Sequence, residues 1–224
     1  MSSSARKMRW NPYVLNGDPE AFDGFWRDHL ATGGRRLLFI IGRGFDFRAD
    51  AAPARIAGLG AAERHAWILK YQNGQPDSIE RARRTDANVK RFAEIFGEAT
   101  TTIDVRMSVS GSSSNVTSRN AKSAVSRPVE LAAYTDIVVD ISAMPRTVAL
   151  TAIAQLIAVL DELELKGKSV NLHVVVAESA KIDRSHSTGS LSDTVTSLVG
   201  FSGRLTSEST ANVPRVWFPV LGEN

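Results

Sequence analysis

The sequence predicts a three-layer α/β domain with a mostly parallel sheet of about five strands. Its clearest signals are continuous apolar runs that end at glycine or at polar turns, which is typical of strands buried on both faces. A long apolar helical pattern over 147–165 separates two of these runs, and this spacing favours a parallel strand–helix–strand crossover. We expect the strands near residues 37–41, 101–109, 135–141, 170–177 and 214–220.

Composition excludes several classes of chemistry. The 224 residues contain no cysteine, which removes disulfides, thiolate metal sites and cysteine nucleophiles and favours a reducing, cytoplasmic location. The net charge of +3 permits binding to nucleic acid but does not require it. Residues 148–160 form the most apolar later segment, yet Thr151 and Gln155 interrupt it and it is shorter than a membrane span, so no membrane partner is expected.

The chain divides into an N-terminal tail with a flanking helix, residues 1–34, and an α/β domain, residues 35–224. Asp18 followed by Pro19 predicts the start of the flanking helix, because aspartate caps helix N-termini and proline is favoured at the first helical position. Since the chain stops shortly after its last predicted strand, we expect it to be part of a longer protein.

The segments between the first two clear strands are less regular. Residues 61–72 place Trp67, Ile68 and Tyr71 at helical spacing, so a helix is expected there. A second helix should begin at Asp77 or Ser78 and extend to about residue 96. Residues 110–126 are rich in serine and asparagine and predict a loop, or alternatively part of a hairpin with residues 123–129.

The first candidate binding segment follows the strand at 37–41. Gly42 and Gly44 allow the backbone to approach a ligand closely, and Arg43 and Arg48 suit phosphate or carboxylate. Asp46 adds a candidate catalytic carboxylate in the same turn. The alternatives are a tight turn and a surface pair between Asp46 and Arg48.

The second candidate segment follows the strand at 135–141. Asp140 is the other candidate catalytic carboxylate, and Ser142 and Arg146 are candidate ligand-binding residues at the start of the next helix. In a parallel sheet this segment and the Gly42 segment lie at the same edge. Alternatively, Asp140 caps the helix or pairs with Arg146.

The histidines do not predict a metal centre. His29, His65, His173 and His186 are scattered without metal-ligand spacing, and no metal site is expected. We interpret His173, within a predicted strand, as a buried or edge histidine.

Two resemblances involve the segment FIIGRGFDFR. Through Arg43, Gly44, Asp46 and Arg48 it resembles the first strand and loop of TIR domains, which implies a flavodoxin-like domain with NAD cleavage or scaffold interactions. Through Gly42, Gly44, Asp46 and Arg48 it is similar to the G-x-G-x-D-x-R motif of one class of AdoMet methyltransferases, in which an acidic residue that binds ribose ends the next strand. Both families have Rossmann-like nucleotide-binding folds.

These patterns lead to two main functional hypotheses. The first is a Rossmann-like domain that binds or hydrolyses NAD or a related nucleotide, as an effector or sensor module of a larger bacterial system. The second is a non-catalytic interaction domain that contacts a protein partner or a second copy of itself. Methyl transfer from AdoMet is a third reading.

Overall fold

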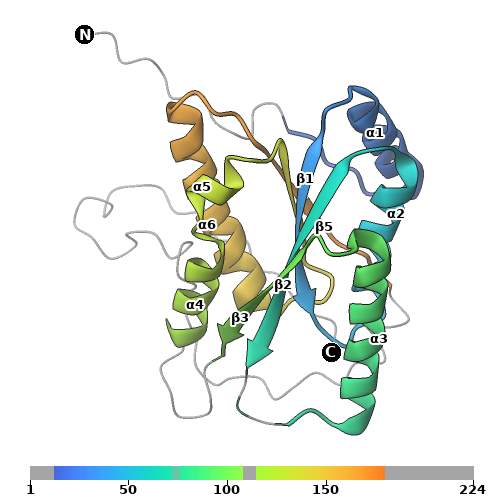
Figure 1. Cartoon of the computed structure of the whole chain (residues 1–224), viewed down its shortest axis with the longest axis vertical. Helices are drawn as coiled ribbons and strands as arrows, with labels where there is room; N and C mark the ends of the chain where they lie inside the picture. Colours follow the sequence, from blue (N-terminus) through green and yellow to red (C-terminus); the bar gives the residue numbers. More distant parts are fainter. Residues whose placement is uncertain (1–12, 73, 75, 108–114, 180–224) are drawn as a thin grey trace, which may run out of the picture.

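The predicted fold class is confirmed: a computed structural model shows a five-stranded, all-parallel sheet flanked by helices (Figure 1). The structure describes residues 13–72, 74, 76–107 and 115–179. In chain order the elements are α1 (Pro19–Ala31), β1 (Arg36–Arg43), α2 (Ala51–Leu59), β2 (Glu63–Gln72), α3 (Ile79–Phe96), β3 (Thr100–Arg106), α4 (Asn115–Val125), α5 (Pro128–Leu131), β4 (Asp136–Asp140), α6 (Arg146–Leu165) and β5 (Asn171–Val175).

The strand order is β3-β2-β1-β4-β5. The chain therefore adds strands in one direction from β1 to β3, then crosses back and adds β4 and β5 on the other side of β1. Ile41 pairs with Asp140 at the carboxyl ends of β1 and β4. These two strands are the neighbours between which the order reverses, and ligands of open α/β sheets bind outside such a reversal point.

Helices cover both faces of the sheet, with α1, α2 and α3 on one side and α4, α5 and α6 on the other (Figure 1). Alternate side chains of the central strands pack against the two helical layers. Leu38 and Ile40 pack in the core under α4 and α6, whereas Leu37, Phe39 and Ile41 pack in the core under α1, α2 and α3. All five are fully buried, which explains why this strand reads as an unbroken apolar run.

The flanking helix α1 begins as its sequence predicts. The side chain of Asp18 accepts a hydrogen bond from the backbone N–H of Ala21 at 2.8 Å, and Pro19 occupies the first turn. Trp26 and Leu30 on its inner face are buried in the core under α2 and α3. Similarly, Ser78 caps α3 as predicted, by accepting from the N–H of Arg81.

The prediction of a helix over 61–72 is wrong, because Glu63–Gln72 form β2. The spacing of Trp67, Ile68 and Tyr71 fits one face of a helix as well as it fits this strand. The four consecutive residues 66–69 are all buried, since Trp67 and Leu69 face one layer of helices and Ala66 and Ile68 face the other. A short run that is apolar on both faces fits a central strand and a buried helix equally well. Only its pairing with the neighbouring strands makes this run a strand.

The prediction of a loop or hairpin through 110–126 is also wrong where the structure describes this region, because residues 115–125 form α4. Its buried residues are small: Ala121, Ala124 and Val125 pack under α6 in the core. Polar Thr117 and Ser118 are buried as well, so the polar composition concealed an inward-facing side. A polar composition therefore does not exclude a packed helix, because small side chains allow two helices to approach closely.

Two further points complete the fold. The strand expected at 214–220 lies outside the described residues. Within the described ranges, none of the helices combines the length and apolar character needed to cross a membrane.

Candidate functional site

The candidate site lies at the carboxyl edge of the sheet, where the segments after β1 and β4 meet. A Cβ atom added to Gly44 would lie 2.9 Å from the carbonyl oxygen of Ala143, and one added to Gly42 would lie 2.8 Å from it. The parallel pairing of β1 and β4 thus brings the two segments to one edge, as expected, and into direct contact. The two glycines are needed at least for this close approach.

The segment after β1 is held in place by α3. The side-chain amide of Asn88 donates to the carbonyl oxygens of Gly44 and Asp46, both at 2.8 Å. Asn88 is itself buried, although its helix is otherwise mostly polar. Asp46 accepts from Arg48 through the guanidinium, at 2.9 and 2.7 Å, and through the backbone N–H. The Asp46–Arg48 pair considered as an alternative in the sequence is therefore present, and the turn is rigidly braced.

Asp140, at the end of β4, is almost completely buried, with 1% of its surface exposed. Its Oδ1 accepts from the backbone N–H of Ser142 at 2.9 Å, and the Ser142 hydroxyl accepts from the N–H of Ala177 at 2.8 Å. Burial raises the pKa of Asp140 to about 6; hydrogen bonds from Ser142 oppose this shift and the charges of Asp46 and Asp50 add to it. A carboxyl group with this pKa can exchange a proton near neutral pH.

Three buried polar atoms at this edge lack a hydrogen-bond partner: Oδ2 of Asp140, the hydroxyl of Tyr71 and Nε of Arg43. They come from β4, β2 and β1. The Tyr71 hydroxyl lies over the backbone of Gly42, 2.5 Å from where a Cβ would stand. Burial, and then the charge of Asp140, raises the pKa of Tyr71, which keeps its proton and remains a donor. Unsatisfied groups of this kind are costly in a folded protein and often mark places where a ligand binds.

The outer parts of the two predicted arginines, Arg43 and Arg146, reach toward solvent at this edge. Arg43 Nη2 is 3.6 Å from a carboxylate oxygen of Asp86 on α3, a pair open to solvent on the aspartate side. Arg146 begins α6 and is exposed, and it is not the partner of Asp140 in any described contact. Pro145 precedes α6 without a side-chain cap. The first N–H groups of this helix thus have no capping side chain at the point where the two segments meet.

Sequence reasoning missed Tyr71 and Asn88 at this edge. Tyr71 was assigned to a helix, and once residues 63–72 form a strand its position near the carboxyl end of β2 follows at once. Asn88 carries a weaker signal, because a polar residue on the buried side of an amphipathic helix is the only hint of its role.

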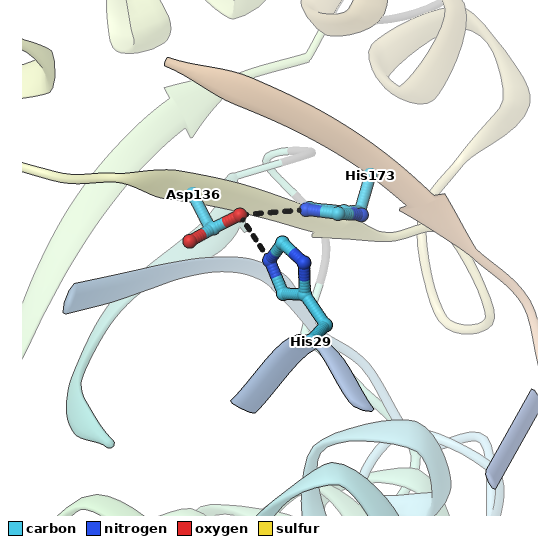
Figure 2. A group of neighbouring side chains, drawn as sticks. All are labelled: His29, Asp136 and His173. Carbon is cyan, nitrogen blue, oxygen red and sulfur yellow. Dashed lines mark hydrogen bonds and ion pairs between the residues drawn. The ribbon is translucent and has the colours of Figure 1, made fainter. Parts of the chain in front are cut away.

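The structure also assembles a polar cluster that no sequence pattern predicts, at the opposite, amino-terminal edge of the sheet. His29 from α1 and His173 from β5 both direct Nε2 at Oδ1 of Asp136, the first residue of β4, at 2.7 and 2.9 Å (Figure 2). The two histidines are separated from Asp136 by 107 and 37 residues, so no local spacing could reveal them. They are the residues interpreted above as scattered.

Comparison with known proteins adds no further information. No protein-family model matches the sequence, and no curated protein matches it.

Proposed function

We propose that the carboxyl edge between β1 and β4 binds a nucleotide, with NAD as the first candidate, and that Asp140 is the acid–base group of a hydrolytic reaction there. The observation that carries the proposal is the coincidence of two features. The strand order reverses between β1 and β4, and buried polar atoms without a described partner lie near the carboxyl ends of these strands and of β2, Arg43 toward α3 and Tyr71 toward the α4 and α6 layer. A ligand that supplies those partners would offset their desolvation cost.

The chemistry of these groups fits a ribose phosphate. An ionised Asp140 Oδ2 accepts hydrogen bonds, as a ribose hydroxyl requires, whereas Tyr71 and Arg43 donate, as phosphate oxygens require. The uncapped N–H groups at the start of α6 supply further donors for an anion. Donors and one acceptor near the same carboxyl edge of the sheet favour a nucleotide over a purely apolar ligand.

The strand order separates the resemblances from one another. It corresponds to the order 3-2-1-4-5 of dinucleotide-binding domains, whereas flavodoxin-like domains, which the TIR resemblance implies, have the order 2-1-3-4-5. β2 is the strand after the glycine segment, and it ends at Tyr71 and Gln72 without the acidic residue expected for AdoMet. The strand order favours NAD or a related dinucleotide as the first ligand to test, whereas the missing acidic residue counts equally against the usual ribose contact of NAD and of AdoMet.

The test is calorimetric titration of the full chain with NAD, ATP and AdoMet, followed by chromatographic detection of nicotinamide release. We expect NAD to bind, and Tyr71→Phe and Arg43→Gln each to weaken binding about tenfold, the loss of one hydrogen bond to an anion. Asp140→Asn should lose hydrolysis, because an amide cannot exchange the proton, and should also weaken binding, because an NH2 group in place of Oδ2 cannot accept from a ribose hydroxyl.

Two control variants match these changes away from the site. Asp104→Asn removes an exposed carboxylate from β3, and Arg83→Gln removes an exposed guanidinium from α3. Both should bind NAD as the parent protein does. If none of the three nucleotides binds, the nucleotide proposal fails, and the non-catalytic interaction domain becomes the better reading.

The wider context that we propose is an effector or sensor module of a larger cytoplasmic system, with a protein partner or a second copy of the chain. The absence of cysteine from the sequence supports a reducing compartment. Size-exclusion chromatography with light scattering tests the self-association.

A further inference from the structure

We propose that His29, Asp136 and His173 bind one divalent transition-metal ion of the zinc class, which links α1 to β4 and β5. This site is independent of the nucleotide proposal. Asp136 and Asp140 are at opposite ends of β4, about 13 Å apart at the rise of a strand.

The ligand atoms are already gathered. Nε2 of His29, Nε2 of His173 and a carboxylate oxygen of Asp136 all lie within 4.8 Å of one another, and within the described part of the chain this group comprises these three residues. In Figure 2 both imidazole rings point their nitrogen at the same carboxylate oxygen. Two imidazoles and a carboxylate form a common ligand set for zinc and related ions, and they leave further coordination positions open.

The hydrogen-bond geometry around Asp136 fits a bound cation better than a cluster held together by hydrogen bonds alone. Oδ1 faces three nitrogen atoms, because Asn171 Nδ2 lies 3.0 Å away in addition to the two histidines. A carboxylate oxygen offers about two lone-pair sites, so three N–H donors exceed its capacity. A metal ion removes this excess, since the imidazole nitrogens then present lone pairs to the metal instead of protons to the oxygen.

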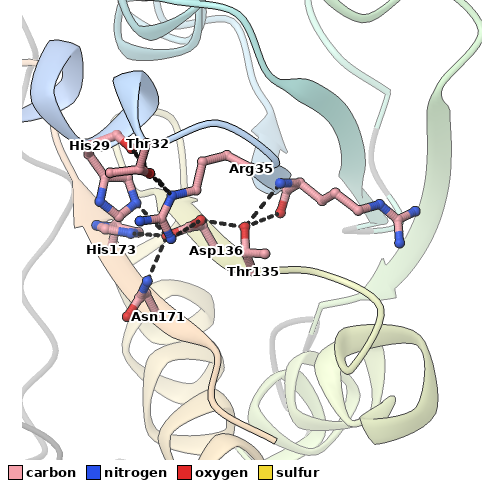
Figure 3. A network of polar contacts seen from close by, with 8 residues as sticks. His29, Thr32, Arg35, Thr135, Asp136, Asn171 and His173 are labelled. Carbon is pink, nitrogen blue, oxygen red and sulfur yellow. Dashed lines mark hydrogen bonds and ion pairs between the residues drawn. The ribbon is translucent and has the colours of Figure 1, made fainter.

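The second carboxylate oxygen has its own partners (Figure 3). The Thr135 hydroxyl donates to Oδ2 at 2.6 Å, and Nη1 of Arg35 lies 3.6 Å from it. Arg35 is held by the carbonyl oxygen of His29 and the hydroxyl of Thr32. Such contacts orient a metal-binding carboxylate and are typical of the shell around metal ligands.

Charge and burial also suit a metal site. Asp136 is fully buried and Arg35 lies beside its second carboxylate oxygen. The two histidine side chains are each 14% exposed, so an ion can reach the cluster from solvent.

Aromatic side chains fix the imidazole rings. Phe25 stacks on His29 with centroids 5.4 Å apart, and Trp26 lies 4.8 Å from the ring of His173. Both aromatic residues belong to α1, which is packed into the core. Ligands that are held before the metal arrives lose less conformational entropy on binding.

The experiment uses the full chain without an affinity tag, stripped of metal and titrated with ZnCl₂ by calorimetry. We expect one equivalent to bind, and His29→Gln and His173→Gln each to weaken binding at least tenfold. His65→Gln is the matched control, because His65 is part-exposed on β2 and bonded to Glu63 outside the cluster. It should bind zinc as the parent protein does.

A second measurement needs no variant and so does not depend on their folding. X-ray absorption of the zinc-loaded parent protein should show two imidazole nitrogens and a carboxylate oxygen around the metal. Failure of zinc to bind stoichiometrically, retention of full affinity in both histidine variants, or a ligand set without two imidazoles would each overturn the proposal. The cluster would then be a hydrogen-bonded clamp.

Discussion

At the scale of single residues, Asp140 is the most informative side chain. Sequence position alone placed a carboxyl group at the end of a buried strand, and the structure shows it 1% exposed with one oxygen unpartnered. Burial of this kind disfavours the charged form, and it dominates the raised pKa. Ionised Asp140 therefore lowers the free energy of unfolding at neutral pH, which is typical of groups retained for function.

Asp140 should make the stability of the protein depend on pH. Its pKa is about 6 in the folded state against an ordinary value of 3.8, so the folded state binds more protons between these values. Stability is then lost as pH rises from about 4 to about 6, by about 3 kcal/mol, and the loss persists at higher pH. Asp140→Asn stays neutral and should escape this loss, so its stability advantage over the parent should grow by about 2 kcal/mol between pH 4.5 and 7.5 in urea denaturation.

The matched control is Asp104→Asn, which removes a carboxylate exposed on β3. It separates the effect of burial from that of net charge. An advantage of Asp140→Asn that is the same at both pH values would show that Asp140 is not a buried, raised-pKa group.

At the scale of elements, the close approach of β1, β2 and the segment after β4 depends on Gly42. Its φ angle is not positive, so the requirement is for space and not for a left-handed backbone. The Tyr71 hydroxyl and the Ala143 carbonyl oxygen occupy the volume that a side chain would need. The glycine that suggested a phosphate contact is thus required by packing in any case.

Gly42→Ala should destabilise the protein by about 1–3 kcal/mol, the usual cost of overpacking. Tyr71→Phe alone should be neutral or slightly stabilising, because it removes a buried hydroxyl without a partner. The double variant should recover part of the loss, because the contact with Tyr71 disappears while that with Ala143 remains. A double-mutant cycle in chemical denaturation measures this coupling.

Gly58→Ala provides the control for the substitution itself. Gly58 is exposed near the end of α2, and a Cβ there meets nothing within 4 Å. It should stabilise the protein by up to about 1 kcal/mol through helix propensity. Strictly additive effects of Gly42→Ala and Tyr71→Phe would argue against the contact between the Tyr71 hydroxyl and Gly42.

At the scale of the whole molecule, α1 belongs to the core. The sequence suggested a flanking element beside the α/β domain, and the structure packs Trp26 and Leu30 into the same cluster as β1, β4 and α3. The helix lies against β4 and β5, where His29 contacts Asp136 and Trp26 contacts His173. We therefore expect α1 and the sheet to unfold together.

Trp26→Ala should lower the free energy of unfolding by about 3–5 kcal/mol, since Trp26 is only 1% exposed. Phe47→Ala is the comparison, because Phe47 is 57% exposed and should cost less than about 1 kcal/mol. Far-UV circular dichroism and fluorescence should report one coincident transition for the parent and for both variants. A separate early transition in Trp26→Ala would mean that α1 is an independent appendage.

The fold class and the elements with strong local signals follow from the amino-acid pattern alone. These signals act through local chemistry and are therefore visible in the sequence alone. They are the apolar run 37–41, the similar run in β4 and the cap residues Asp18 and Ser78. The shared edge of the two candidate segments also followed, because parallel strands place their carboxyl ends together. Asp140 was found for the same reason.

The strand order, the identity of β2 and the partners of the buried polar groups depend on contacts between distant parts of the chain. Residues 66–69 are apolar enough for a strand or a helix, and pairing with β1 and β3 selects the strand. His29, Asp136 and His173 meet because α1 packs across β4 and β5, contacts that bring together residues far apart in the chain. Long-range packing creates such sites, and local sequence patterns carry no record of it.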